Sequence, residues 1–190
     1  MISHKHKFIF VHVAKTAGTS IRAALQSEYD ELHKPHHSYL HRIKNTLPEQ
    51  VYNTYYKFGT VRNPWAREVS RYIFLRARCH VEKYIKSPEV QACKQGFNSY
   101  LSTCVKMNQV DYNAIKINGK IGLDYVMKVE DLQHDFDIVC GKIGLARRKL
   151  SHTNKSKHKH YTEYYDDEAR EIVATQYAPD IEYFGYEYGE

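Results

Sequence analysis

Residues 7–20 read KFIFVHVAKTAGTS, and this stretch decides the fold. Its first half is a run of β-branched and aromatic residues, which predicts a buried strand over Lys7–Val13. The small and hydroxyl-bearing residues after it predict a loop. A helix comes next, because four residues share one of its faces at helical spacing: Ile21, Ala24, Leu25 and Tyr29. A strand, a loop and a helix in this order form the basic unit of a parallel α/β sheet.

Two further strand–helix pairs follow along the chain. Tyr55–Val61 predicts a second strand, and Asn63-Pro64 behind it predicts the cap and first residue of a helix. Asp124–Val129 predicts a third strand, followed by a helix from about Asp131 to Ile143. Other helices are expected over Tyr39–Thr46, roughly Ser87–Lys106, and from near Asp166. We therefore expect one domain over residues 1–190, with an α/β fold and a mostly parallel central sheet flanked by helices.

Composition and charge narrow the class of protein. The 190 residues are 42% hydrophobic, and no apolar run approaches the roughly 18 residues of a membrane helix. We expect no integral membrane segment and no signal peptide, and therefore a cytoplasmic protein. Residues 163–190 carry nine acids and one base, a net −8, so residues 1–162 carry +14. A basic body of this kind favours an anionic partner.

Cysteine and histidine patterns argue against disulfides and metals. The four cysteines form no CxxC pair, so we expect them to be reduced and mostly structural. The twelve histidines include close pairs such as His4/His6 and His158/His160, but no cysteine lies near them. A zinc site needs enough ligands at close spacing. We expect no bound metal.

The loop after the first strand contains residue types that can bind an anion. Lys15 brings a positive charge, Ala17 and Gly18 let an anion approach the backbone, and Thr16, Thr19 and Ser20 add hydroxyl donors. Unpaired N–H groups where a strand turns into a helix also attract anions. The loop therefore predicts a phosphate site, or otherwise an ordinary capped turn. It is not the Walker A pattern, because its lysine precedes the glycine.

A second strand-to-helix passage predicts another anion site. The segment reads TVRNPWAREVS over residues 60–70 and places Arg62 at the carboxyl end of a strand, where ligands of open α/β sheets bind. An arginine fork with a hydroxyl, Ser70, suits a phosphate. Taken alone, this motif is better explained as a surface arginine and an ordinary helical serine.

Together the two motifs resemble a family, the sulfotransferases that use 3′-phosphoadenosine 5′-phosphosulfate. The resemblance is strongest to carbohydrate sulfotransferases related to the heparan 2-O-sulfotransferases and to their small bacterial relatives. FIFVHVAKTAGTS is similar to that family's 5′-phosphosulfate loop, and FGTVRNPWAREVSRY to its 3′-phosphate motif. Agreement continues in NQVDY, DYVMKVEDL and DIEYFGY, in the expected order. The resemblance implies a P-loop NTPase-like three-layer fold.

The resemblance also implies roles for single residues. Six of them hold the 5′-phosphosulfate: Lys15, Thr16, Ala17, Gly18, Thr19 and Ser20. Arg62 and Ser70 hold the 3′-phosphate, and the basic loop with Asn154, Lys155 and Ser156 closes over the nucleotide. Lys15 neutralises charge on the departing phosphate, as electrostatic catalysis requires.

The reaction implied is transfer of a sulfuryl group to a hydroxyl of a carbohydrate or glycan, without a metal. A base must take the hydroxyl proton, and histidine suits this near neutral pH. Relatives carry a histidine between the two motifs. His37 fits that place, with His36 as the substitute. An exposed loop histidine is the alternative for either. His12, within the strand, is expected to be packed or to support the loop.

Two other functions stay open. Lys15-Thr16 imitates the lysine and hydroxyl of a P-loop nucleotide kinase or NTPase, which magnesium dependence would reveal. A basic nucleic-acid-binding module is less favoured, because tyrosines such as Tyr29, Tyr72 and Tyr177 fall at core-facing positions.

Overall fold

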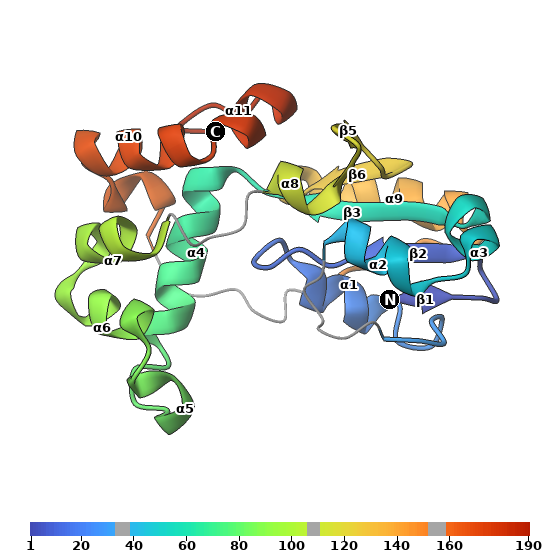
Figure 1. Cartoon of the computed structure of the whole chain (residues 1–190), viewed down its shortest axis with the longest axis horizontal. Helices are drawn as coiled ribbons and strands as arrows, with labels where there is room; N and C mark the ends of the chain where they lie inside the picture. Colours follow the sequence, from blue (N-terminus) through green and yellow to red (C-terminus); the bar gives the residue numbers. More distant parts are fainter. Residues whose placement is uncertain (33–38, 106–110, 152–158) are drawn as a thin grey trace. The chain divides into compact units, whose positions relative to one another are not determined.

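A computed structural model describes residues 1–32, 39–105, 111–151 and 159–190 of the chain (Figure 1). The structure divides into two compact units, each continuous in space but not in sequence. The first comprises Met1–Arg62 with Asp111–Asn154, and the second comprises Asn63–Val110 with Lys155–Glu190. The expectation of one domain over residues 1–190 stays a prediction.

The first unit contains the central sheet, and it is mostly parallel as predicted. Its strands are β1 (Ile2–Ser3), β2 (Phe8–Val11), β3 (Tyr56–Val61) and β6 (Tyr125–Lys128), in the order β1-β2-β3-β6. β2 pairs parallel with β3, and β3 pairs parallel with β6, whereas the short β1 runs antiparallel along β2. The three predicted strands are therefore confirmed, and β1 is an edge strand that the sequence patterns did not indicate.

Phenylalanines on one face of this sheet form the centre of the core. Phe8, Phe10 and Phe58 are fully buried, and the rings of Phe10 and Phe58 lie 5.2 Å apart. Helices α1 (Gly18–Ala24) and α9 (Leu132–Lys142) add buried residues such as Ile21 and Phe136 to the same cluster. Burial of this apolar surface holds β2 and α1 together, and so it positions the loop between them.

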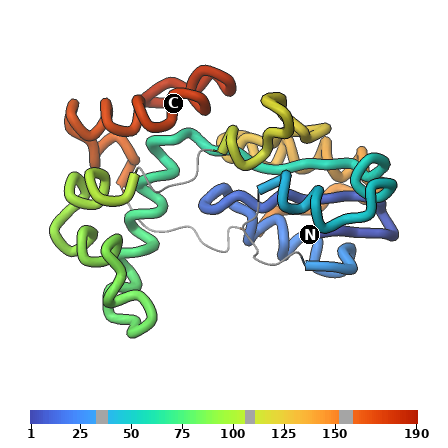
Figure 2. The backbone as a smooth tube through the Cα atoms, in the orientation of Figure 1, coloured from blue at the N-terminus to red at the C-terminus, as the bar shows by residue number. Residues whose placement is uncertain are grey.

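Shorter elements complete the first unit. They are α2 (Leu40–Thr46), α3 (Glu49–Thr54), α8 (Asp111–Ile115), the hairpin of β4 (Lys116–Ile117) and β5 (Lys120–Ile121), and the 3-10 helix η2 (Val129–Asp131). Figure 2 draws the same backbone as a smooth tube. The hairpin turns at Asn118 and Gly119, whose φ angles of 50° and 77° suit a tight two-residue turn. The predicted helix over Tyr39–Thr46 is confirmed as α2.

The second unit consists of helices. They are α4 (Pro64–Arg76), α5 (Glu82–Ile85), α6 (Pro88–Gln95), α7 (Phe97–Cys104), η3 (Tyr161–Tyr164), α10 (Asp167–Gln176) and α11 (Ala178–Phe184). Asn63 caps α4 as predicted, because its side chain accepts hydrogen bonds from the N–H groups of Trp65 and Ala66. The helical stretch expected over Ser87–Lys106 is two helices, because Gly96, with φ 130°, separates α6 from α7.

A buried carboxylate anchors this second unit. Glu68 of α4 is 1% exposed and accepts hydrogen bonds from the hydroxyls of Tyr100, at 2.5 Å, and Tyr177, at 2.6 Å. Burial, and after it the nearby Glu68 charge, hold the pKa of Tyr165 well above its usual 10.0. Tyrosines such as Tyr72 and Tyr177 are core residues, as predicted.

Candidate functional site

The loop between β2 and α1 has an unusual backbone. Lys15 and Ala17 both have left-handed φ angles, 67° and 60°, which residues with a Cβ rarely adopt. Gly18, which follows Ala17, is the first residue of helix α1. Left-handed and right-handed residues in succession turn neighbouring N–H groups toward one side, which makes a concave seat for an anion. Strain of this kind marks the loop as a candidate functional site.

The ring of His12 packs under this loop. His12 is 8% exposed and stacks on Phe10, with ring centroids 5.9 Å apart at 25°. A Cβ built on Gly18 would lie 2.0 Å from His12 Cδ2 and 2.1 Å from its Nε2. Only glycine therefore fits above the imidazole. The expectation that His12 is packed and supports the loop is confirmed.

Two side chains tie the loop to β3. Thr16 is fully buried, and its hydroxyl donates a hydrogen bond to the carbonyl of Val13 at 2.9 Å. The same hydroxyl lies 2.7 Å from the hydroxyl of Thr60, with which it shares a second hydrogen bond. Arg62, just past the end of β3, donates from Nη1 to the carbonyl of Lys15 at 3.4 Å. The guanidinium of Arg62 and the chain of Lys15 therefore lie side by side. The Thr16 hydroxyl is therefore bonded inside the protein, to the Val13 carbonyl and the Thr60 hydroxyl.

Asp111 is a buried acid at this end of the sheet that the sequence patterns did not single out. It is fully buried, and its Oδ2 accepts a hydrogen bond from the backbone N–H of Arg62 at 3.2 Å. Asp111 begins α8, so this contact fixes that helix to the chain that leaves β3. It lay in the NQVDY segment, but the spacing of that segment indicated no partner.

A comparison of the whole sequence with protein families identifies the family of this chain. Residues 1–187 match the profile of the sulfotransferase family. This chain belongs to the sulfotransferase family. A protein of Archaeoglobus fulgidus described as uncharacterized is 29% identical over 111 residues, which cover 54% of this chain and 79% of that protein. Membership supports sulfuryl transfer as the general reaction.

The other predicted site residues of this sulfotransferase lie on helices or outside the described residues. Ser70 lies on α4, in the second unit, and is half-buried. Arg67, on the same helix, is buried with its guanidinium 5.7 Å from the centre of the Tyr177 ring. Thr19 is exposed and Ser20 half-buried on α1. The two candidate bases and the basic loop lie outside the described residues: His36, His37, Asn154, Lys155 and Ser156.

Thiols and metal ligands offer little further chemistry. Burial raises the pKa of Cys93 to about 12 and of Cys104 to about 11, so neither is a thiolate nucleophile near neutral pH. Within the described ranges, Asp131, His134 and Asp135 are the three potential metal ligands that lie within 4.8 Å of one another. The Asp135 carboxylate already accepts hydrogen bonds from the Tyr125 hydroxyl and the Lys128 N–H.

The helices of the structure are short. In the parts of the chain that the structure describes, none combines the length and the apolar character needed to span one.

Proposed function

We propose that this sulfotransferase transfers a sulfuryl group from 3′-phosphoadenosine 5′-phosphosulfate to a hydroxyl of a carbohydrate or glycan. The observation that carries the proposal is the loop of residues 15–20, with two left-handed residues and the Arg62 guanidinium against its backbone. We also propose that the fold is the P-loop NTPase-like three-layer arrangement. Its parallel strands β2, β3 and β6 and the loop after β2 support this.

The donor's phosphosulfate fits the chemistry of this loop. It is a small, highly charged anion, and the loop offers backbone N–H groups, a lysine and an arginine. The small Ala17 and Gly18 let the anion approach the backbone. Lys15, Thr16, Ala17, Gly18, Thr19 and Ser20 are the proposed 5′-phosphosulfate ligands, with Thr16 acting through its N–H.

The proposed chemistry is a single displacement. The acceptor oxygen forms a bond to sulfur while the bond from sulfur to the 5′-phosphate oxygen breaks, and 3′,5′-bisphosphoadenosine leaves. Lys15 neutralises the charge that grows on the departing oxygen. A histidine, His37 or His36, takes the acceptor's proton. Positioning and charge supply the rate enhancement, by analogy with phosphoryl transfer, and no metal takes part.

The remaining assignments rest on the motifs. Arg62 and Ser70 are proposed for the 3′-phosphate, and Asn154, Lys155 and Ser156 for the loop over the nucleotide. The carbohydrate acceptor comes from the resemblance of the motifs to carbohydrate sulfotransferases. The cytoplasmic location stays a prediction.

Titration calorimetry with 3′,5′-bisphosphoadenosine in the absence of magnesium tests the donor site. We expect tight binding by the native chain. Lys15→Ala is expected to weaken it by about tenfold to a hundredfold, the loss of a charge-assisted contact, and to abolish sulfuryl transfer. Alanine keeps a Cβ at this left-handed position, so the backbone strain stays the same. The matched control is Lys120→Ala, which removes an exposed lysine of β5 in the same unit.

Two outcomes would contradict the proposal. If the Lys15→Ala variant transferred the sulfuryl group at the native rate, the assignment of this loop to the active site would be wrong. If the chain instead bound adenosine triphosphate more tightly than 3′,5′-bisphosphoadenosine, and only with magnesium, the result would point to the kinase or NTPase alternative. His37→Ala with His36 intact separates the two bases, since unchanged turnover would assign the role to His36.

A further inference from the structure

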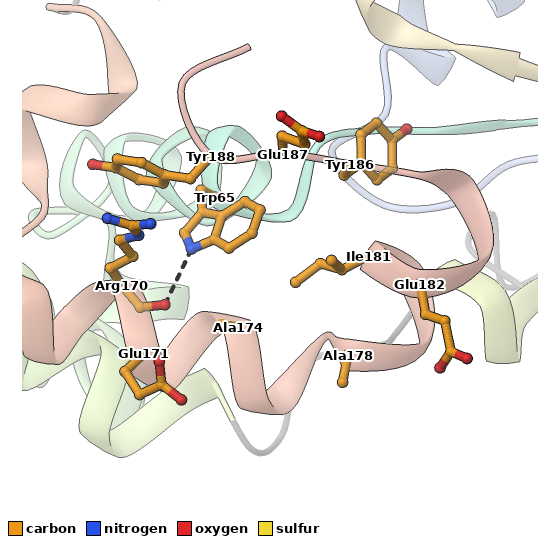
Figure 3. Close-up of a pocket in the computed structure, with 10 residues that line it drawn as sticks. All are labelled: Trp65, Arg170, Glu171, Ala174, Ala178, Ile181, Glu182, Tyr186, Glu187 and Tyr188. Carbon is orange, nitrogen blue, oxygen red and sulfur yellow. Dashed lines mark hydrogen bonds between the residues drawn. The ribbon is translucent and has the colours of Figure 1, made fainter.

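A cavity of about 620 Å³ is lined entirely by residues of the second unit. Figure 3 shows that α10, α11 and the C-terminal segment surround the indole of Trp65, with Ile181 projecting toward it. Tyr186 and Tyr188 add aromatic rings to the wall. The volume lies within the range of small-ligand pockets, and the wall combines apolar and aromatic side chains with charged ones.

Hydrogen bonds hold the walls of this cavity in place. Trp65 donates from Nε1 to the carbonyl of Arg170 at 3.1 Å, which fixes α10 against the start of α4. Asn63 donates from Nδ2 to the carbonyl of Glu187 at 2.9 Å, and the Tyr188 hydroxyl donates to the carbonyl of Thr162 at 3.2 Å. The cavity is therefore preformed, which lowers the entropy cost of filling it.

The charges around the cavity are mostly negative. Three exposed glutamates line it, Glu171, Glu182 and Glu187, and Figure 3 shows their carboxylates at its periphery. Among the described residues, none of the three forms an ion pair. Arg170 is the single cation among the lining residues, and its guanidinium lies 4.7 Å from the centre of the Tyr188 ring. The cavity therefore carries a net negative charge, and one of its rings already accommodates a cation.

We propose that this cavity binds a protonated organic amine carried on a ring-sized apolar body. The body packs against Trp65, Ile181 and Tyr188, and the ammonium group is held by the field of the glutamates. A neutral ligand of the same shape leaves the carboxylates without a counter-charge, and an anionic ligand is repelled by them. The site thus selects the opposite charge to the proposed donor nucleotide, and it does not depend on that nucleotide.

Fluorescence gives a direct readout of this cavity, because Trp65 is the single tryptophan of the chain. The probes are cyclohexylmethylammonium, cyclohexylmethanol and cyclohexanecarboxylate, which share one ring and differ in charge. None of the three probes absorbs or emits light at the wavelengths used to follow the indole. We expect the ammonium to change the Trp65 emission saturably, and the alcohol to bind about tenfold more weakly, the loss of one charge-assisted contact. The carboxylate should bind more weakly still.

Charge-neutral variants then assign the selectivity to the glutamates. In the double variant Glu182→Gln/Glu187→Gln, ammonium affinity should fall to that of the alcohol, and alcohol affinity should not change. A merely structural role would weaken both ligands. The control is Glu168→Gln, which removes an exposed acid of α10 that does not line this cavity and should leave all three affinities unchanged.

Three results would overturn the proposal. These are no change in Trp65 emission with the ammonium, equal affinity for all three probes, or undiminished ammonium selectivity in the double variant. The probe series on the native protein is decisive even where the variant is unstable. Because the assay contains no nucleotide and follows no transfer, its failure leaves the proposed sulfotransferase reaction untouched.

Discussion

Substitution of Gly18 by alanine tests whether His12 shapes the proposed anion-binding loop. The new Cβ would lie 2.0 Å from Cδ2, 2.1 Å from Nε2 and 2.8 Å from Cγ of the His12 ring. Carbon atoms in contact normally lie about 3.5–4.0 Å apart, so the ring or the loop must shift by roughly 1.5 Å. His12 is buried and stacked on Phe10, so the ring has little room to move.

The magnitude follows from two opposing effects. Overpacking a buried site costs about 1–3 kcal/mol. Replacing glycine by alanine in a helical conformation returns about 0.4–1 kcal/mol by restricting the unfolded chain. The overpacking is the larger, so we expect Gly18→Ala to lower the free energy of unfolding by about 1–2 kcal/mol. The shifted loop should also bind 3′,5′-bisphosphoadenosine more weakly.

Urea unfolding followed by far-ultraviolet circular dichroism measures the stability change. Gly141→Ala is the matched control, because Gly141 lies in α9 with no atom within 4 Å of a built Cβ. That variant should be neutral or more stable by up to about 1 kcal/mol. The two substitutions are chemically identical, so an opposite sign isolates the contact with His12.

A double-mutant cycle decides the cause. His12→Ala removes the ring and leaves space for a Cβ at position 18. Gly18→Ala should therefore cost little in the His12→Ala background, which gives a coupling energy of about 1–2 kcal/mol. Strictly additive effects, or a Gly18→Ala chain as stable as Gly141→Ala, would refute the idea that the imidazole excludes a side chain at Gly18.

Three further variants probe the two units. Hydrogen bonds from Arg148 and Ser27 lower the pKa of Glu28 from 4.5 to about 2, so its stabilisation is complete above pH 4.5 and is lost as the pH falls toward 2. In acid titrations, the free energy of unfolding of the Arg148→Ala variant should therefore fall less steeply between pH 4.5 and 2 than that of the native chain. Gly119→Ala, at φ 77°, should lower the thermal midpoint through about 1 kcal/mol of backbone strain. Tyr177→Phe leaves Glu68 one hydrogen bond short and should reduce the urea-unfolding free energy by about 1–3 kcal/mol.

The parallel sheet could be predicted because its signals are local. Each of β2, β3 and β6 is a short apolar run followed by a turn or cap, so the strand and the element after it are read from neighbouring residues. Gly96 and the Asn118-Gly119 turn are local signals too, and they explain the break between α6 and α7 and the β4–β5 hairpin. The sequence patterns predicted one helical stretch over Ser87–Lys106 and did not indicate the hairpin.

The candidate site was predictable only where its residues are contiguous. Lys15 to Ser20 are successive residues, so their charge, small size and hydroxyls are visible as one motif. Asp111 reaches the backbone of Arg62 across 49 positions, and Thr16 meets Thr60 across 44. Nothing in the spacing of either pair indicates the contact, because it arises from the packing of β3, α8 and the loop.

The acidic C-terminal segment shows how the structure separates charges that the sequence presents as one run. Asp166 caps α10 by accepting a hydrogen bond from the Ala169 N–H, and that bond is the main reason its pKa is lowered. Asp180 is 1% exposed and is an interior residue of α11. Glu171, Glu182 and Glu187 instead stay in solvent around one cavity. Helix capping needs one acid at one position, whereas three exposed acids around an aromatic wall produce a local field that attracts cations. The acids of this segment therefore differ in role: one caps a helix, one is buried, and the three glutamates surround the proposed amine site.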